Sequence, residues 1–120
     1  MMIKHLVFII DKPLHGNVKA QEFLDSILMA AAFDQRVDVV FVGDGVFAML
    51  DNQQPEKLDM KNILPVFGTL SLYGINGVTV EEEALKERSL LISQLHEVSN
   101  VLPREKVKQT MSAAHHIFSF

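Results

Sequence analysis

Continuous apolar runs alternate along this chain with segments of helical spacing. Residues 6–10 and 37–42 are almost wholly apolar, which predicts strands that are covered on both faces. Shorter strands are predicted at residues 78–80 and 116–120. Between the first two strands, apolar residues recur at spacings of three and four, so a helix is predicted over residues 20–31.

Further helices are predicted where the pattern is less regular. Residues 46–50 predict a short helix after the second strand, and residues 63–73 have helical spacing that contains Pro65. Proline is tolerated only in the first turn of a helix, so Pro65 is placed there, and Gly74 is the expected C-terminal stop.

The C-terminal third predicts two more helices. Residues 81–88 place acidic residues in the first turn and basic residues in the last, which suits the helix dipole. Pro103 is expected to open the last helix. In between, apolar residues at helical spacing leave the structure ambiguous; they are Leu91, Leu95, Val98 and Leu102.

Alternating strands and helices of this length predict parallel strands joined by right-handed crossovers. The expected fold is a single three-layer α/β domain over residues 1–120, with about five mainly parallel strands and helices on both faces. Sites in such folds lie at the carboxyl ends of the strands. Those ends are residues 11–16, 43–45 and 81–83.

Composition narrows the class of protein. An apolar fraction of 48% in 120 residues supports a sizeable core, and no apolar run approaches the ~20 residues that span a bilayer. The first residues lead directly into an apolar strand, so no signal peptide is expected and the predicted location is cytoplasmic. The net charge of −4 argues against nucleic acid as a direct partner. The chain has no cysteine, which excludes disulfides and thiolate metal sites.

The sequence contains no recognisable catalytic constellation. Residues 43–45 lack the third glycine and the lysine of a phosphate-binding loop, and Asp44 is expected to cap the short helix. His115 and His116 are neighbours on a predicted strand, where side chains point to opposite faces, so no metal site is predicted. The acidic residues 81–83 fit a solvated helix start in which Glu82 pairs with Lys86.

Five short segments, spread over nearly the whole chain, carry a resemblance. They are Pro13-Leu14-His15-Gly16, Asp44-Gly45-Val46-Phe47, Leu72-Tyr73, Leu85-Lys86-Glu87-Arg88 and the final Phe120. Together they resemble the TusC/DsrF branch of the DsrE/DsrF family of small sulfur-relay proteins. The second segment is the most specific, and the first has one extra residue between its proline and histidine.

The resemblance implies an assembly. Such proteins are subunits of TusBCD- or DsrEFH-like complexes, which are dimers of heterotrimers. The complexes pass persulfide sulfur toward tRNA 2-thiouridine synthesis or toward sulfur oxidation. The expected partners are TusD/DsrE-like and TusB/DsrH-like subunits. The resemblance also implies a short strand at about residues 97–101, where the spacing alone was ambiguous.

The resemblance also implies a role without chemistry. The active cysteine of the TusD/DsrE subunit maps to Glu81, and this chain has no thiol, so a non-catalytic scaffold subunit without a cofactor is expected. Gly45 is expected in a tight turn, either because its φ is positive or because another backbone approaches closely. The expected scaffold or interface residues are His15, Gly16, Asp44, Gly45, Phe47, Tyr73 and Glu81.

The high apolar fraction predicts a partner interface on the order of 1,600 Å². Phe47 and Tyr73 are expected to contribute to it, although at least two of Phe47, Met49 and Leu50 fit a core role better. Two alternatives stay open. One is a stand-alone homo-oligomer of structural or regulatory role in the same superfamily. The other is a receiver-like signalling domain built on Asp11 and Asp44, which lacks the expected aspartate pair and lysine.

Overall fold

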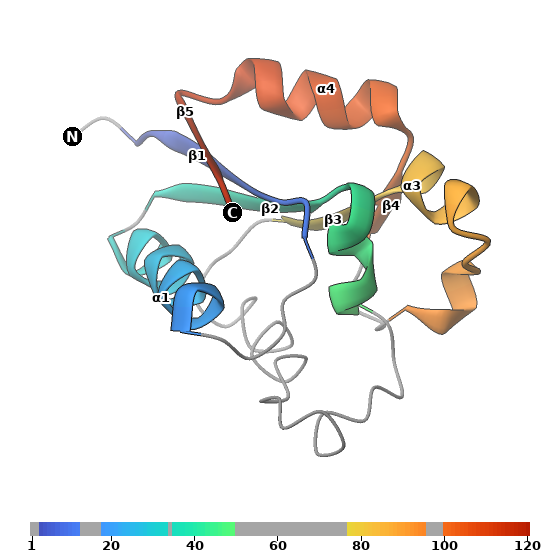
Figure 1. Cartoon of the computed structure of the whole chain (residues 1–120). Helices are drawn as coiled ribbons and strands as arrows, with labels where there is room; N and C mark the ends of the chain where they lie inside the picture. The colour runs from blue at the N-terminus through green and yellow to red at the C-terminus, as the bar shows by residue number, and fades with distance from the viewer. Residues whose placement is uncertain (1–2, 13–17, 34, 50–76, 96–99) are drawn as a thin grey trace.

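Five parallel strands form one sheet in the order β4-β3-β2-β1-β5 (Figure 1). The computed structural model describes residues 3–12, 18–33, 35–49, 77–95 and 100–120. The strands are β1 His5–Ile10, β2 Arg36–Phe41, β3 Gly77–Glu81, β4 Asn100–Leu102 and β5 His116–Ser119. The predicted fold class is therefore confirmed, with strand bounds that differ from the predicted ones by a few residues.

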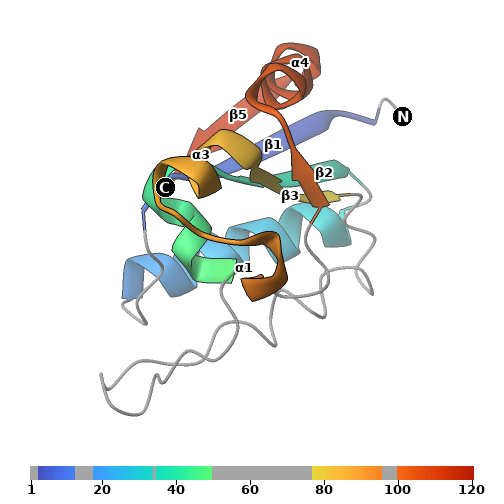
Figure 2. The same ribbon diagram turned by 90° about the vertical axis from the view of Figure 1, so that its right-hand side faces the viewer.

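The helices cover both faces of the sheet. They are α1 Val18–Ala32, the 3-10 helix η1 Gly43–Met49, α3 Glu82–Glu87, the 3-10 helix η4 Ile92–Gln94 and α4 Arg104–Ala113. Figure 1 shows α4 above the sheet, with α1 and η1 below it, and Figure 2 shows the same layers from the side. α4 connects β4, at one edge of the sheet, to β5, at the other edge, where β5 pairs with β1.

Two predicted elements differ from the structure. The short helix predicted at residues 46–50 is a 3-10 helix that begins at Gly43, directly after β2. The ambiguous segment of residues 91–102 holds the three-residue η4 and then β4. Pairing of β4 with β3 at Val80 and Val101 overrides the helical spacing there. The helix predicted at residues 63–73, with Pro65 and Gly74, lies outside the described residues.

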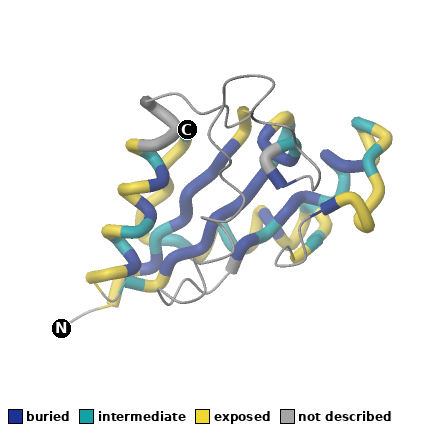
Figure 3. The backbone as a smooth tube through the Cα atoms, turned by 90° about the horizontal axis from the view of Figure 1, so that it is seen from below, coloured by how far each residue is buried: buried dark blue, intermediate teal, exposed yellow. Residues whose placement is uncertain are grey.

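The sheet divides the apolar core in two. Figure 3 shows that the central strands are mostly buried. On the α4 face the buried cluster is small: Val7, Ile9, Val40 and Val107. On the face of α1 and η1 it is larger: Phe8, Ile10, Leu24, Ile27, Ala31, Val37, Val39, Phe41, Val46, Met49, Val78, Val80, Ala84, Leu85 and Leu95. Successive residues of a strand point to opposite faces, so β1 and β2 supply buried residues to both clusters, whereas β3 supplies Val78 and Val80 to the larger one.

Candidate functional site

The carboxyl ends of β2 and β3 are joined by an ion pair between η1 and the end of α3. The Arg88 Nε donates to the Asp44 Oδ1 at 2.9 Å, and the Arg88 Nη1 donates to the Ala84 carbonyl at 3.1 Å. Asp44 lies inside η1, which begins at Gly43, so the predicted N-cap is wrong. The Asp44 side chain instead holds η1 against α3, and with 60% of it exposed it remains open to a partner.

Glu81 is the last residue of β3, and its side chain is only 8% exposed. Its Oε1 lies 2.8 Å from the Nη2 of Arg104, which also contacts the Glu87 Oε1 at 3.0 Å. These hydrogen bonds, first that of Glu81 and then that of Glu87, raise the pKa of the Arg104 guanidinium. The prediction of a solvated helix start is therefore wrong at Glu81, because the start of α4 covers it.

The next two carboxylates behave differently from Glu81. The Glu82 Oε1 lies 2.9 Å from the Lys86 Nζ, which confirms the predicted pair one helical turn apart. Both oxygens of Glu83 accept the backbone N–H of Arg104, at 2.9 and 3.1 Å. This N–H is one of the amide groups that α4 leaves unpaired at its start, so Glu83 supplies the missing acceptor.

Gly45 lies against the end of β1. A Cβ at this position would be 1.9 Å from the carbonyl oxygen of Ile10 and 2.6 Å from its carbonyl carbon. A side chain at this position would overlap the backbone of Ile10, so only glycine fits. This confirms one of the two predicted explanations, the close approach of another backbone. The positive φ, +51°, belongs to Gly43 two residues earlier. Together the two glycines let the chain turn directly from β2 into η1.

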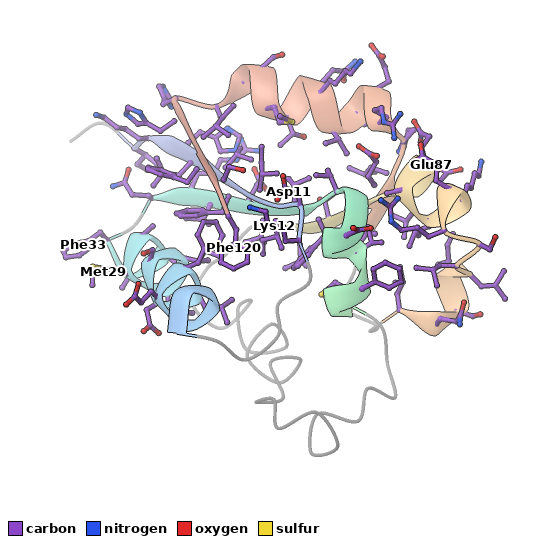
Figure 4. The ribbon with its side chains drawn as sticks, viewed as in Figure 1. Asp11, Lys12, Met29, Phe33, Glu87 and Phe120 are labelled. Atoms are coloured by element: carbon purple, nitrogen blue, oxygen red, sulfur yellow. The ribbon has the colours of Figure 1, made fainter. Side chains whose placement is uncertain are left out.

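Several predicted site residues are not brought together here. His15, Gly16, Leu50 and Tyr73 lie outside the described residues. Phe47 is half-buried in η1, while Met49 is buried in the core. Asp11 is exposed just after β1, next to Lys12. Figure 4 shows both near the centre of the molecule, to the left of Glu87 on α3. Asp44, Gly45 and Glu81 are thus the predicted site residues that the structure places on this rim.

A buried polar pair at the opposite end of the strands was missed. His5 Nε2 contacts the Asp38 carboxylate, and both side chains are nearly inaccessible. The Arg36 Nε lies 3.9 Å from the same carboxylate oxygen. The sequence carried a signal, since Asp38 interrupts the apolar run of β2 and a buried carboxylate requires a partner.

The two C-terminal histidines, His115 and His116, differ in their contacts. The Nδ1 of His115 accepts the backbone N–H of His5 at 2.8 Å, and the His115 N–H donates to the His5 carbonyl at 2.8 Å. His116 is exposed at the start of β5. Within the described ranges, no group of three or more His, Cys, Asp or Glu side chains is arranged to hold a metal ion.

An apolar hollow of about 410 Å³ lies beside α3. Its lining residues are Glu82, Leu85, Lys86, Leu90, Leu91, Ile92 and Ser93. Leu91 and Ile92 are mostly exposed, as are Met29 and Phe33, which point away from α1 in Figure 4. None of the helices in the described parts of the chain has both the length and the apolar character needed to cross a bilayer.

Comparisons with known proteins agree on one family. The TusC homolog of Vibrio parahaemolyticus is 30% identical over 118 residues, which cover 98% of this chain and 100% of that protein. The intracellular sulfur oxidation protein DsrF of Allochromatium vinosum is 29% identical over 133 residues, covering 99% and 98%.

The fold itself also recurs in a solved structure. The ychN protein of E. coli has a TM-score of 0.79 at 16% identity, covering 99% of this chain and 100% of that chain. The DsrE/DsrF-like family model matches residues 4–120. This match spans all five strands, so the chain belongs to the DsrE/DsrF-like family.

Proposed function

We propose that this chain is a non-catalytic subunit of a cytoplasmic sulfur-relay complex of the TusBCD/DsrEFH type. Its partners would be a TusD/DsrE-like subunit, which carries the active cysteine, and a TusB/DsrH-like subunit. The relatives named TusC homolog and DsrF support a sulfur-relay subunit. Their identities, 30% and 29%, are nearly equal, so the proposal covers both tRNA thiolation and sulfur oxidation as the pathway served.

The observation that carries the proposal is that Glu81 is buried and paired with Arg104. Persulfide transfer uses a thiolate nucleophile, and this chain has no cysteine at any position. At the end of β3, where the resemblance places the partner's cysteine, this chain has a buried carboxylate held by Arg104. A carboxylate fixed in an ion pair has no role as a sulfur acceptor, but it can hold the local backbone in one position.

In this proposal, the exposed side chains near Glu81 contact the partner subunit. Arg104 is 42% exposed in its side chain and Asp44 is 60% exposed, so both can meet a partner, whereas Glu81 acts through Arg104. Glu81 is in this sense a positioning residue. His15, Gly16, Gly45, Phe47 and Tyr73 complete the proposed contact surface, which would place the partner's cysteine without taking part in the chemistry.

The first experiment tests for chemistry on this chain. The purified chain is incubated with a persulfidated donor protein, and its intact mass is then measured. We expect no change in mass, because the chain has no thiol. The TusD/DsrE-like paralogue, treated in the same way, shows that the donor is competent. A stable gain of one sulfur atom on the unaltered chain contradicts the non-catalytic role.

The second experiment tests the partners. The chain is mixed with its TusD/DsrE-like and TusB/DsrH-like paralogues, and the species are separated by sedimentation. We expect one complex that holds all three chains and transfers sulfur faster than the cysteine-bearing subunit alone. If this chain stays apart from both paralogues and self-associates instead, the stand-alone homo-oligomer is the better description.

A further inference from the structure

The outer edge of β5 has no partner strand among the described residues. β5 is the last strand of the sheet and pairs with β1 alone, and no described residue pairs with its other side. Ile117 and Phe118 are 46% and 45% exposed. The strand contains no Lys, Arg, Asp, Glu or Pro. Charged residues and proline are what commonly prevent an edge strand from pairing with another chain. Figure 1 shows β5 at the edge of the sheet that faces the viewer, in front of β1.

The direction of the backbone groups along β5 follows from one hydrogen bond. The N–H of Phe120 donates to the Ile9 carbonyl at 2.9 Å, so it points toward β1. Backbone groups of neighbouring residues alternate in direction across a parallel pair. The N–H and C=O groups of Ile117 and Ser119 therefore point away from β1 and form the outer edge of the sheet.

We propose that this edge pairs antiparallel with β5 of a second copy of the chain, about a two-fold axis at Phe118. An axis perpendicular to the sheet keeps each residue on its own face, so residues that lie opposite each other must differ in number by an even amount. Centring on Phe118 places Ile117 opposite the second copy's Ser119, and Ser119 opposite its Ile117. Each such pair exchanges two hydrogen bonds, so all the outward groups of Ile117 and Ser119 find partners.

The side chains favour a second copy as the occupant. The Phe118 ring stacks on Phe8, with ring centroids 5.0 Å apart, and keeps an exposed outer part. In the proposed register the second copy's Phe118 lies directly opposite, and cross-strand aromatic pairs stabilise antiparallel strands. Ile117 lies on the α4 face and Phe118 on the α1 face, so both faces of the joined sheet bury apolar area. The strand carries no fully charged group that two copies would bring together.

Because the chain has no cysteine, single introduced cysteines can report by disulfide formation which residues of the two β5 strands lie opposite each other. Phe118→Cys gives each chain one thiol, and two such residues lie opposite each other across the axis, within disulfide reach. Under mild oxidation with oxidised glutathione at micromolar concentration, we expect most of this variant to become a covalent dimer. Ile117→Cys or Ser119→Cys alone places the two thiols about two residues apart along the strands, ~8 Å between Cα atoms, so neither should cross-link. An equal mixture of these two variants should cross-link, and it keeps Phe118 intact.

Two further measurements separate this result from chance collision. Met29→Cys places an exposed thiol on α1, away from β5, and we expect little dimer from it. Ile117→Lys puts a charge on the edge, and sedimentation should show at least about tenfold weaker self-association. The proposal is overturned if Phe118→Cys and Met29→Cys cross-link equally, or if Ile117→Cys cross-links alone. It is also overturned if the unaltered chain is monomeric and the Phe118 thiol cross-links only to a paralogous subunit. The cross-linking of this chain to itself needs no partner subunit, so its outcome does not depend on the proposed sulfur-relay role.

Discussion

The two faces of the sheet are held by different physical means. The α1 face buries fifteen apolar residues in one cluster, whereas the α4 face buries four. The buried polar residues of the described chain are His5, Asp38 and Glu81. His5 and Asp38 each lie two residues before a member of the α4-face cluster in the same strand, and Glu81 contacts α4 through Arg104, so all three lie on that face.

The two faces contribute differently to the stability of the fold and to the position of α4. Burial of apolar area is not directional, so the α1 face can supply most of the folding free energy without fixing one arrangement. Ion pairs and hydrogen bonds require definite geometry, and Arg104 joins α4 to Glu81 at the end of β3 and to Glu83 in α3. We infer that the apolar face stabilises the fold, while the polar contacts determine where α4 and the nearby rim lie.

The largest expected effect is at Gly45, on the segment that closes the apolar face. Gly45→Val should give no soluble folded protein, because a Cβ would overlap the Ile10 carbonyl, which is backbone and cannot move aside. Gly43→Ala is the matched control. Its new Cβ has space, with neighbouring atoms at 3.8 Å, and only its positive φ costs about 1 kcal/mol. Circular dichroism and soluble yield measure both, and a well-folded Gly45→Val chain contradicts the close approach.

Two neighbouring isoleucines compare the faces directly. Ile10 points into the large cluster and Ile9 into the small one. We expect Ile10→Ala to lower the free energy of unfolding by about 4 kcal/mol and Ile9→Ala by about 2 kcal/mol, since the densely packed face relaxes less around a cavity. Urea denaturation of the two variants measures the difference. Equal losses would mean that α4 packs as tightly as α1 and η1 do.

The buried pair on the α4 face gives the next effect. His5→Ala leaves the Asp38 carboxylate buried with only the guanidinium of Arg36 at 3.9 Å, and should lower the free energy of unfolding by about 3 kcal/mol. Replacing both residues, His5→Phe with Asp38→Val, should restore most of this loss, because no charge then remains buried. Thermal unfolding of the single and double variants tests the idea. A single variant as stable as the unaltered chain would show that the pair contributes nothing.

The smallest effect on stability is expected at Glu81. Glu81→Gln keeps a hydrogen-bond acceptor for Arg104 but removes the charge, so the unfolding temperature should stay close to that of the unaltered chain. In the reconstituted complex, the rate of persulfide appearance on the downstream acceptor should fall, because Arg104 is held less firmly. Glu87→Gln contacts the same Nη2 from an exposed position and should leave that rate unchanged. Equal rates for all three chains would leave Glu81 a purely structural role.

The sequence predicted the sheet better than it predicted the rim. Continuous apolar runs identified β1 and β2, because a doubly covered strand needs apolar residues on both faces. Close approach of a backbone at Gly45 was one of the two predicted explanations for this glycine, although Gly45 lies inside η1 and not in a turn before it. The partners of Glu81 and Asp44 were not predicted. Arg104 and Arg88 lie 23 and 44 residues away along the chain, and local pattern carries no information on such distant contacts.

Gly45 also bears on how the end of the sheet moves. The Ile10 carbonyl accepts the N–H of Val42 at 3.0 Å, and Gly45 lies directly against that same carbonyl. The segment after β2 thus covers the hydrogen bond that ties β2 to β1. We expect the Val42 amide to be strongly protected from hydrogen exchange, although it lies one residue beyond the end of its strand. Because Gly45 has no side chain, η1 can cover the hydrogen bond between β2 and β1 and prolong its lifetime. The carboxyl ends of these two strands would then separate only when η1 moves away from them.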